Sequence, residues 1–274
     1  MRYSLDKKYP WPKNYPSFAE ASLEYYKEMM SLARICLAGL AEGIETAPEN
    51  LTDKMLDKEQ MGEGYSSSIY RFFRYFMRVD AMEEPCQVHT DIGMMTMIPL
   101  SSAPALQLLH SKEFAWIDIE KYGQERDVVI FCGETLERIT AYYFRAVIHR
   151  VARTGGRERY SEVFLLRARP DSWIDSEGLN TKVIGKLYYD LKNKMSIAEY
   201  MRMQYANKKS ANFVNKKGKP VINMISSSET GQQKEEEQKE DIPYEEKVIL
   251  IGVNNAQRQE EDGLKKEEKD ESDK

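Results

Sequence analysis

Between residues 69 and 168 the chain is a succession of short segments rich in β-branched and aromatic residues, separated by polar, glycine or proline breaks. Many short strands at this spacing are typical of a sandwich or barrel and argue against alternating β-α units. The sequence therefore predicts a mainly β domain. The expected strands cover residues 69–78, 94–100, 105–109, 115–119, 128–132, 144–151 and 161–168.

Helical patterns flank this β region on both sides. Apolar residues recur every three or four positions from Leu23 to Ile44, which predicts an amphipathic helix that begins at Pro16 and ends near Gly43. A shorter helix is expected from Asn50, a good N-cap, to about residue 61. Further predicted helical segments are a turn at 135–140 and helices at 182–192 and 196–207, the last with Ser196 as N-cap. We expect the helices to cover a sheet.

Composition and charge argue against several classes of protein. The formal net charge of −5 gives no basic character that would suggest a nucleic-acid partner. No segment approaches the ~18 apolar residues of a membrane span, and no signal peptide is visible. The three cysteines form no disulfide pattern. These features predict a soluble, cytoplasmic protein without nucleic-acid or membrane partners.

The chain divides into three predicted parts. Residues 1–64 form a helical lead-in that packs on the core, 65–207 form the β domain with its C-terminal helices, and 208–274 form a charged tail. From residue 229 onward the tail has 16 acidic against 8 basic residues, so we expect it to be mostly disordered. Residues 248–253 are a short apolar island in it, interpreted as an incidental patch or a docking motif for another protein.

Two of the three histidines have chemically suggestive neighbours. His89 and Asp91 are two residues apart, so on extended chain both side chains point to the same side. His149 lies 58 residues after Asp91, at the end of a predicted strand, and could join them through the fold. Two histidines and one carboxylate with open positions opposite suit non-haem Fe(II) oxygen chemistry. His110, in a predicted hairpin turn, is not expected to be a ligand.

A second pair follows His149 by ten residues. Arg159 and Ser161 are again two apart and can face one way. A guanidinium and a hydroxyl together suit the binding of a carboxylate. Each pair alone is commonplace, but the order of the three motifs makes coincidence improbable.

With these motifs the sequence resembles the iron(II)- and 2-oxoglutarate-dependent oxygenases, in their isopenicillin N synthase-like branch. The similarity extends from about residue 10 to 207 and is strongest in a few motifs. They are Gln87-Val88-His89-Thr90-Asp91-Ile92-Gly93, Leu106-Gln107-Leu108-Leu109 with Trp116, Gly133-Glu134-Thr135-Leu136-Glu137, Val147-Ile148-His149-Arg150-Val151 and Arg159-Tyr160-Ser161.

The resemblance implies a double-stranded β-helix, a relative of the jelly roll, with Fe(II) bound by His89, Asp91 and His149. Arg159 and Ser161 would bind 2-oxoglutarate, helped by Tyr75, although the family's asparagine two residues before that tyrosine is Phe73 here. The activity implied is that of a dioxygenase, an oxidoreductase that oxidises a small organic substrate with O2 while 2-oxoglutarate is decarboxylated to succinate.

Two alternatives remain open from the residues. One is an iron oxidase of the same branch that does not use 2-oxoglutarate. The other is a catalytically silent scaffold, suggested by the acidic tail and by the expectation that the family's first N-terminal segment is missing before Trp11. Nothing in the sequence names the substrate.

Overall fold

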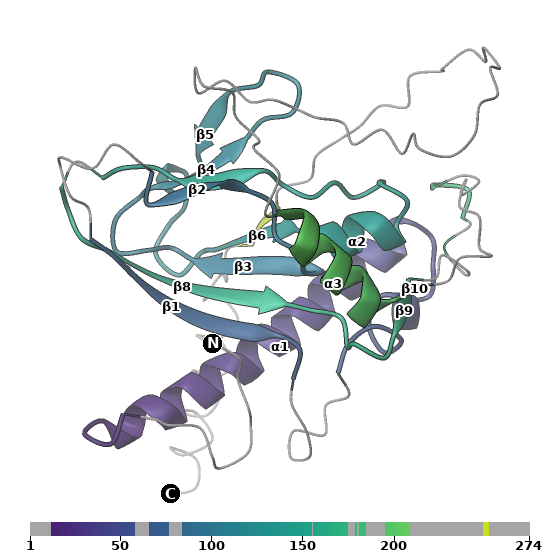
Figure 1. Cartoon of the computed structure of the whole chain (residues 1–274), viewed down its shortest axis with the longest axis horizontal. Coiled ribbons are helices and arrows are strands. Elements are labelled where there is room, and N and C mark those ends of the chain that lie inside the picture. Colours follow the sequence, from purple (N-terminus) through teal and green to yellow (C-terminus); the bar gives the residue numbers. More distant parts are fainter. Residues whose placement is uncertain are drawn as a thin grey trace, which may run out of the picture.

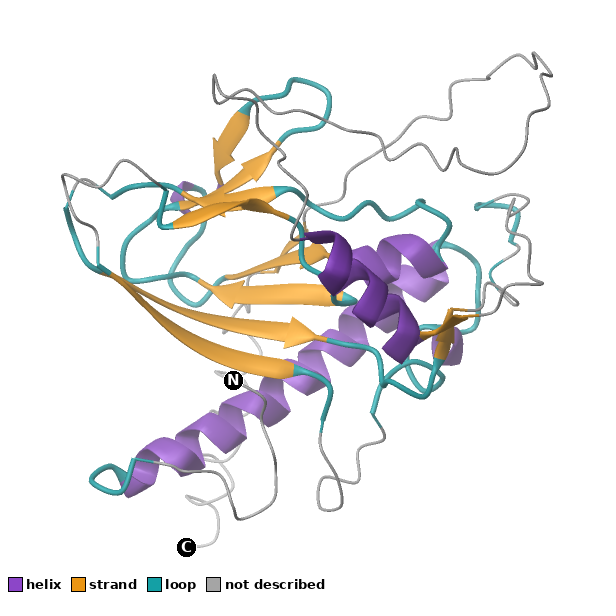
Figure 2. Cartoon of the chain, in the orientation of Figure 1, coloured by secondary structure: helices purple, strands orange, loops and turns teal. Residues whose placement is uncertain are grey.

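The computed structural model describes residues 12–57, 66–76, 84–154, 156–174, 179, 181–184, 195–208 and 249–251. Its strands form two main sheets (Figures 1 and 2). The larger sheet has the order β1-β8-β3-β6-β11, and the smaller has the order β2-β7-β4-β5. The bounds are β1 Ile69–Tyr75, β2 Cys86–His89, β3 Met95–Pro99, β4 Leu106–Leu109, β5 Trp116–Asp118, β6 Val128–Cys132, β7 His149–Val151, β8 Arg159–Leu166 and β11 Ile249–Ile251.

Every pairing in the two sheets is antiparallel, and the chain passes back and forth between them. Strands β1, β3, β6 and β8 belong to the larger sheet, while the intervening β2, β4, β5 and β7 belong to the smaller. This alternation confirms the expected double-stranded β-helix. A separate two-stranded sheet joins β9 (Trp173–Ile174) to β10 (Met195–Ser196).

The core has two layers, because the larger sheet is buried on both faces. On β6, Val129 and Phe131 pack with residues of the smaller sheet, whereas Val128, Ile130 and Cys132 pack with the helix side. Alternate positions of a strand point to opposite faces. The uninterrupted apolar run of β6 is therefore the signature of a strand covered on both sides.

Helix α1 (Pro16–Gly43) covers the outer face of the larger sheet. Its apolar stripe, including Tyr26, Ala33 and Leu37, is buried against β3 and β8 residues such as Met97 and Phe164. Pro16 occupies the first turn, as expected, because its missing N–H would have no partner there. The residues of α1 thus share one core cluster with those of the larger sheet.

Most other helix predictions were confirmed, with one correction. Helix α2 (Glu134–Ile139) matches the expected turn, and α3 (Ile197–Lys208) begins after Ser196, whose hydroxyl accepts a bond from Glu199 N–H. The predicted helix from Asn50 is wrong: a 3-10 helix, η1 (Pro48–Asn50), is followed by turns through Leu56. The fixed φ of Pro48 favours an earlier start. A second 3-10 helix, η2, covers Ile119–Lys121.

Several expectations fall partly outside the described residues. Of the helix predicted at 182–192, only the turn at 182–184 is described. The charged tail also lies outside, except that Ile249–Ile251 in its apolar island forms β11 and pairs with β6. The three-part division of the chain stays a prediction. No helix within the described ranges is long and apolar enough to cross a membrane.

Candidate metal centre

His89 and His149 meet across neighbouring strands of the smaller sheet. Their Cα atoms are partners in the antiparallel pairing of β2 with β7, and their ring centroids are 4.2 Å apart. On its other side β7 pairs with β4, where Leu108 is opposite His149. The fold therefore brings together two imidazoles that are far apart in the sequence.

Both imidazoles are oriented by the backbone. Nδ1 of His89 lies 2.8 Å from the Gln87 carbonyl oxygen, and Nδ1 of His149 lies 3.1 Å from that of Val147. A carbonyl oxygen only accepts, so Nδ1 carries a hydrogen in each ring, and Nε2 is the nitrogen that faces the Asp91 carboxylate. A second-nitrogen bond of this kind is typical of histidines that bind metals.

Asp91 completes the group, and the two Nε2 atoms approach its carboxylate. His89 Nε2 is 3.6 Å from Oδ1, and His149 Nε2 is 3.6 Å from Oδ2. Thr96 Oγ1 donates to Oδ2 at 2.6 Å and fixes the carboxylate. One ligand atom from each of the three residues lies within 4.8 Å of the others. Metal–ligand bonds of about 2.0–2.2 Å fit this spacing around one ion.

The three side chains are unequally exposed. His149 is 6% exposed and Asp91 16%, whereas His89 is 34% exposed. The group therefore has a buried side, toward Phe131, whose ring centroid is 4.7 Å from that of His149, and a side open to solvent at His89. Two imidazoles and one carboxylate leave further positions on a metal ion for other ligands.

Helix α2 holds the segment that carries Asp91. Glu134 N–H donates to the Asp91 carbonyl at 2.8 Å, and Thr135 N–H donates to that of Gly93 at 3.0 Å. The backbones are so close that a Cβ atom on Gly133 would lie 2.3 Å from the Gly93 carbonyl oxygen. Only glycine permits this approach. The glycines of the two sequence motifs therefore hold the metal-binding segment against the helix.

Arg159 and Ser161 lie on the buried face of β8, with the exposed Tyr160 between them. Their side chains thus face the same way, as expected. Tyr75 is opposite Arg159 in the pairing of β1 with β8, and its ring centroid lies 5.1 Å from the guanidinium carbon. Burial raises the pKa of Tyr75 to about 12, so its phenol is neutral. Phe73 stacks on Tyr75, with ring centroids 5.6 Å apart.

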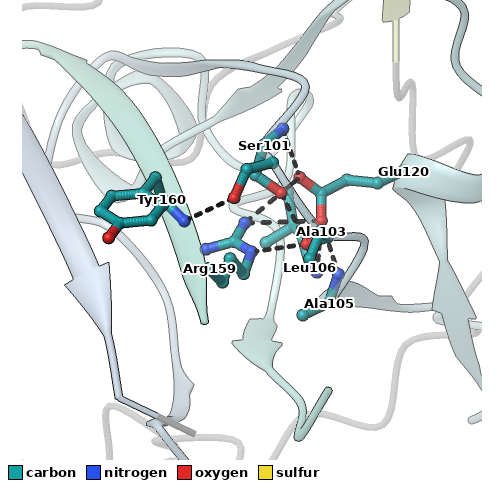
Figure 3. Close-up of polar contacts among 8 residues, drawn as sticks. Ser101, Ala103, Ala105, Leu106, Glu120, Arg159 and Tyr160 are labelled. Atoms are coloured by element: carbon teal, nitrogen blue, oxygen red, sulfur yellow. Dashed lines mark hydrogen bonds and ion pairs between the residues drawn. The ribbon is translucent and has the colours of Figure 1, made fainter. Parts of the chain in front are cut away.

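Sequence reasoning missed Glu120, which forms an ion pair with Arg159. Arg159 Nη2 lies 3.2 Å from Oε1 and 3.4 Å from Oε2 of Glu120, and Nε donates to the Ala103 carbonyl at 3.2 Å (Figure 3). The two side chains are 1% and 2% exposed. The guanidinium expected to bind a co-substrate already has a buried partner inside the protein. No local pattern around Glu120 signals this contact.

Cys86 is a second residue without a sequence signal. It is a free thiol on β2, with Sγ 3.9 Å from His89 Nδ1. A register shift between Cys86 and His89 breaks the simple alternation of the strand. Burial raises the pKa of Cys86, with a further contribution from Asp91, while Arg159 lowers it. The thiol therefore lies within electrostatic reach of both the metal-binding group and Arg159.

His110 lies in the β4–β5 turn, where its Nδ1 accepts from Glu113 N–H at 3.1 Å.

Residues 70–168 match the sequence model of the 2OG-Fe(II) oxygenase superfamily. Among curated proteins, the chain is 29% identical over 168 residues to the 2-oxoglutarate-Fe(II) type oxidoreductase hxnY of Emericella nidulans, covering 59% of this chain and 45% of that protein. It is 26% identical over 171 residues to the isopenicillin N synthase of Streptomyces clavuligerus, covering 60% and 50%. The chain thus spans about half the length of these relatives.

Solved structures agree on the fold. A 2OG-Fe(II) oxygenase family protein of Caulobacter crescentus superposes with a TM-score of 0.61 at 19% identity, covering 76% of this chain and 68% of that one. A full-length Neurospora crassa protein in complex with alpha-KG gives a TM-score of 0.60 at 18% identity, covering 76% and 64%. All the motifs described above, from Tyr75 to Ser161, lie within the residues matched by the sequence model.

Proposed function

Because the chain belongs to the 2OG-Fe(II) oxygenase superfamily and is related to its isopenicillin N synthase and flavonol synthase branch, we propose that it is an Fe(II)-dependent oxygenase. In this proposal it oxidises a small organic substrate with O2, with 2-oxoglutarate as co-substrate. His89, Asp91 and His149 bind the iron. Arg159, Ser161 and Tyr75 form the co-substrate region.

The observation that carries the proposal is the convergence of the three iron ligands. The nitrogen and oxygen donors of His89, Asp91 and His149 are all within 4.8 Å of one another. Both Nδ1 atoms are bonded to backbone carbonyls, so Nε2 is the nitrogen that each ring can offer to an ion. Two neutral imidazoles and one carboxylate suit Fe(II) and leave room for O2 and a co-substrate.

The protein's own contribution is positioning. The bound iron would supply the oxygen chemistry. Thr96 holds Oδ2 of Asp91, and helix α2 holds the backbone of the same residue. The buried side of the group, at His149 and Phe131, excludes water, while the side at His89 is open for ligands to enter. A rigid first set of ligands preserves the open positions when substrates exchange.

A second candidate is an iron oxidase of the same branch that does not consume 2-oxoglutarate. The contact of Glu120 with Arg159 favours it, because the cation expected to hold the distal carboxylate of 2-oxoglutarate is already paired. A catalytically silent scaffold has less support, since the complete ligand set and its oriented imidazoles serve no purpose in a protein without metal.

The test begins with iron loading in the absence of oxygen. The purified chain is loaded with Fe(II), mixed with 2-oxoglutarate and exposed to air-saturated buffer while O2 uptake and succinate are measured. We expect slow, iron-dependent succinate formation even without the primary substrate, and none in Asp91→Ala. Iron binding without any succinate or 2-oxoglutarate consumption would favour the second candidate. Absence of iron binding would contradict both.

A further inference from the structure

Glu120 is fixed in place independently of Arg159. Its Oε2 accepts from the N–H groups of Ala105 and Leu106 at 2.7 and 2.8 Å, where β4 begins. Its Oε1 accepts from Ser101 N–H at 3.1 Å and from Ser101 Oγ at 2.5 Å. Four donors bind this carboxylate besides the guanidinium (Figure 3). Displacing it would leave these donors without a partner, which is costly for the two buried N–H groups of Ala105 and Leu106.

The Glu120 carboxylate is ionised. Burial by itself raises the pKa of Glu120, but Arg159 and the donors of Ser101, Ala105 and Leu106 outweigh burial and hold the pKa below its usual range. The pair therefore has no net charge. The neighbouring Tyr75 phenol adds none, since burial raises its pKa to about 12.

The third nitrogen of the Arg159 guanidinium, Nη1, differs from the other two. Nη2 faces Glu120 and Nε faces the Ala103 carbonyl, but Nη1 is buried and has no hydrogen-bond partner among the described residues. A buried donor without an acceptor is costly and is usually satisfied by a water or a ligand. Nη1 can thus donate one hydrogen bond to a ligand, next to a fixed negative charge.

We propose that Glu120 is a specificity-determining residue of the co-substrate region. It neutralises Arg159, so the second carboxylate of 2-oxoglutarate adds little to binding, and a 2-oxo acid with a neutral hydrogen-bond acceptor at its far end binds at least as tightly. The inference rests on the proposed function, since it concerns the co-substrate of the same iron site. A fixed anion that neutralises a binding cation lowers the affinity for a negatively charged ligand relative to a neutral one. Specificity is such a difference between two affinities.

The magnitude follows from the charges. A distal carboxylate at Nη1 would meet the attraction of Arg159 and also a repulsion from Glu120, which binds the same guanidinium through Nη2. Removing the charge of Glu120 should therefore raise the affinity for 2-oxoglutarate by at least about tenfold, a change of about 1.4 kcal/mol.

The experiment compares 2-oxoglutarate with its 5-methyl ester, which has the same carbon backbone and a neutral far end with one added methyl group. Binding to the full chain loaded with Mn(II) is measured by calorimetry for wild type, Glu120→Gln and a control, Asp53→Asn. Asp53 is an exposed carboxylate paired with Arg34 near the end of the lead-in. In wild type and in the control we expect the ester to bind at least as tightly as 2-oxoglutarate. In Glu120→Gln we expect 2-oxoglutarate to bind at least about tenfold tighter than in wild type, with little change for the ester.

The inference is overturned if wild type prefers 2-oxoglutarate over the ester by about tenfold or more, or if Glu120→Gln does not improve 2-oxoglutarate binding. Either result leaves the proposed function intact. If neither compound binds to wild type or to the variant, the 2-oxo acid part of the proposed function fails with it. Should Glu120→Gln not fold, as judged by circular dichroism, the two ligands on wild type decide alone.

Discussion

The candidate metal-binding group (His89, Asp91 and His149) and the Arg159 region are encoded by similar motifs in the sequence. They differ in which of their atoms are bound by the rest of the protein. Each rests on a pair of polar residues two apart on extended chain. At the candidate metal site, backbone carbonyls bind the Nδ1 atoms of His89 and His149, and the Nε2 atoms of both rings face the Asp91 carboxylate. At Arg159 the functional atoms themselves are engaged, by Glu120 and the Ala103 carbonyl. The spacing of a motif thus predicts which side chains converge. What those side chains can bind also depends on a partner from elsewhere in the fold, as Glu120 is for Arg159.

The largest expected effect concerns the metal-binding group. His149→Ala removes one of three protein ligands, and since even an outer-shell change costs about 10–100-fold in metal affinity, we expect a loss of at least about a thousandfold. Fe(II) titration without oxygen measures it. The control is His110→Ala, since His110 lies in the β4–β5 turn and makes one bond with Glu113. Equal iron affinity in the two variants would refute the assigned ligand set.

The Glu120–Arg159 pair should matter chiefly for stability. Glu120→Ala leaves a buried guanidinium without its counter-ion and should lower the free energy of unfolding by about 3–5 kcal/mol. Replacing both residues, as in Glu120→Leu with Arg159→Met, should recover much of that loss. Urea unfolding of the metal-free proteins measures both. If Glu120→Ala costs under about 1 kcal/mol, comparable to an exposed pair, the contact is not the closed pair inferred here.

A smaller effect is expected where helix α2 meets the Asp91 segment. In Gly133→Ala the added Cβ would lie 2.3 Å from a backbone oxygen, so the free energy of unfolding should fall by about 1–3 kcal/mol. The metal affinity should fall with it, since Asp91 is displaced.

The matched control is Gly39→Ala in α1, where nothing lies within 4 Å of the added Cβ. There the loss of backbone freedom in the unfolded chain should stabilise the protein by about 0.5–1 kcal/mol. Equal effects of the two substitutions would show that the close approach at Gly133 is not a constraint.

The smallest expected effect is on the pH dependence of stability. The pKa of Glu120 is lower in the folded chain than in the unfolded one, so its stabilising contribution is present above about pH 4.3 and is lost as pH falls through the folded pKa. Wild type should therefore lose more stability than Glu120→Gln between about pH 6 and about pH 3. Other acidic groups titrate in both proteins and cancel in the difference. Parallel curves would show that Glu120 is not the titrating group.

Local patterns predicted much of the fold. The strand at Val128–Cys132 was predicted to the residue, because a short apolar run between breaks has few other interpretations. Strand β7 is shorter than its pattern, since only His149–Val151 finds partners on both sides. Strand β2 was missed, because its four residues carry no β-branched or aromatic alternation beyond Val88.

The convergence of His89, Asp91 and His149 was predictable from the sequence, whereas the surroundings of Arg159 were not. The spacing of His89, Asp91, His149, Arg159 and Ser161, read with the family resemblance, indicated which residues come together. The position of Glu120 depends on the turn between β5 and β6 and on donors at the start of β4. Such a contact joins segments through the tertiary fold, so no periodicity within either segment encodes it.

Strand β11 has a consequence for the integrity of the whole molecule. By pairing Ile249–Ile251 with Val128–Ile130 of β6, it occupies an edge whose N–H and C=O groups would otherwise be open to a strand of another molecule. Strand β6 leads directly into Gly133 and the helix that holds Asp91. Loss of the pairing at Ile249–Ile251 would thus expose the edge of β6, close to the Asp91 segment, to a strand of another molecule.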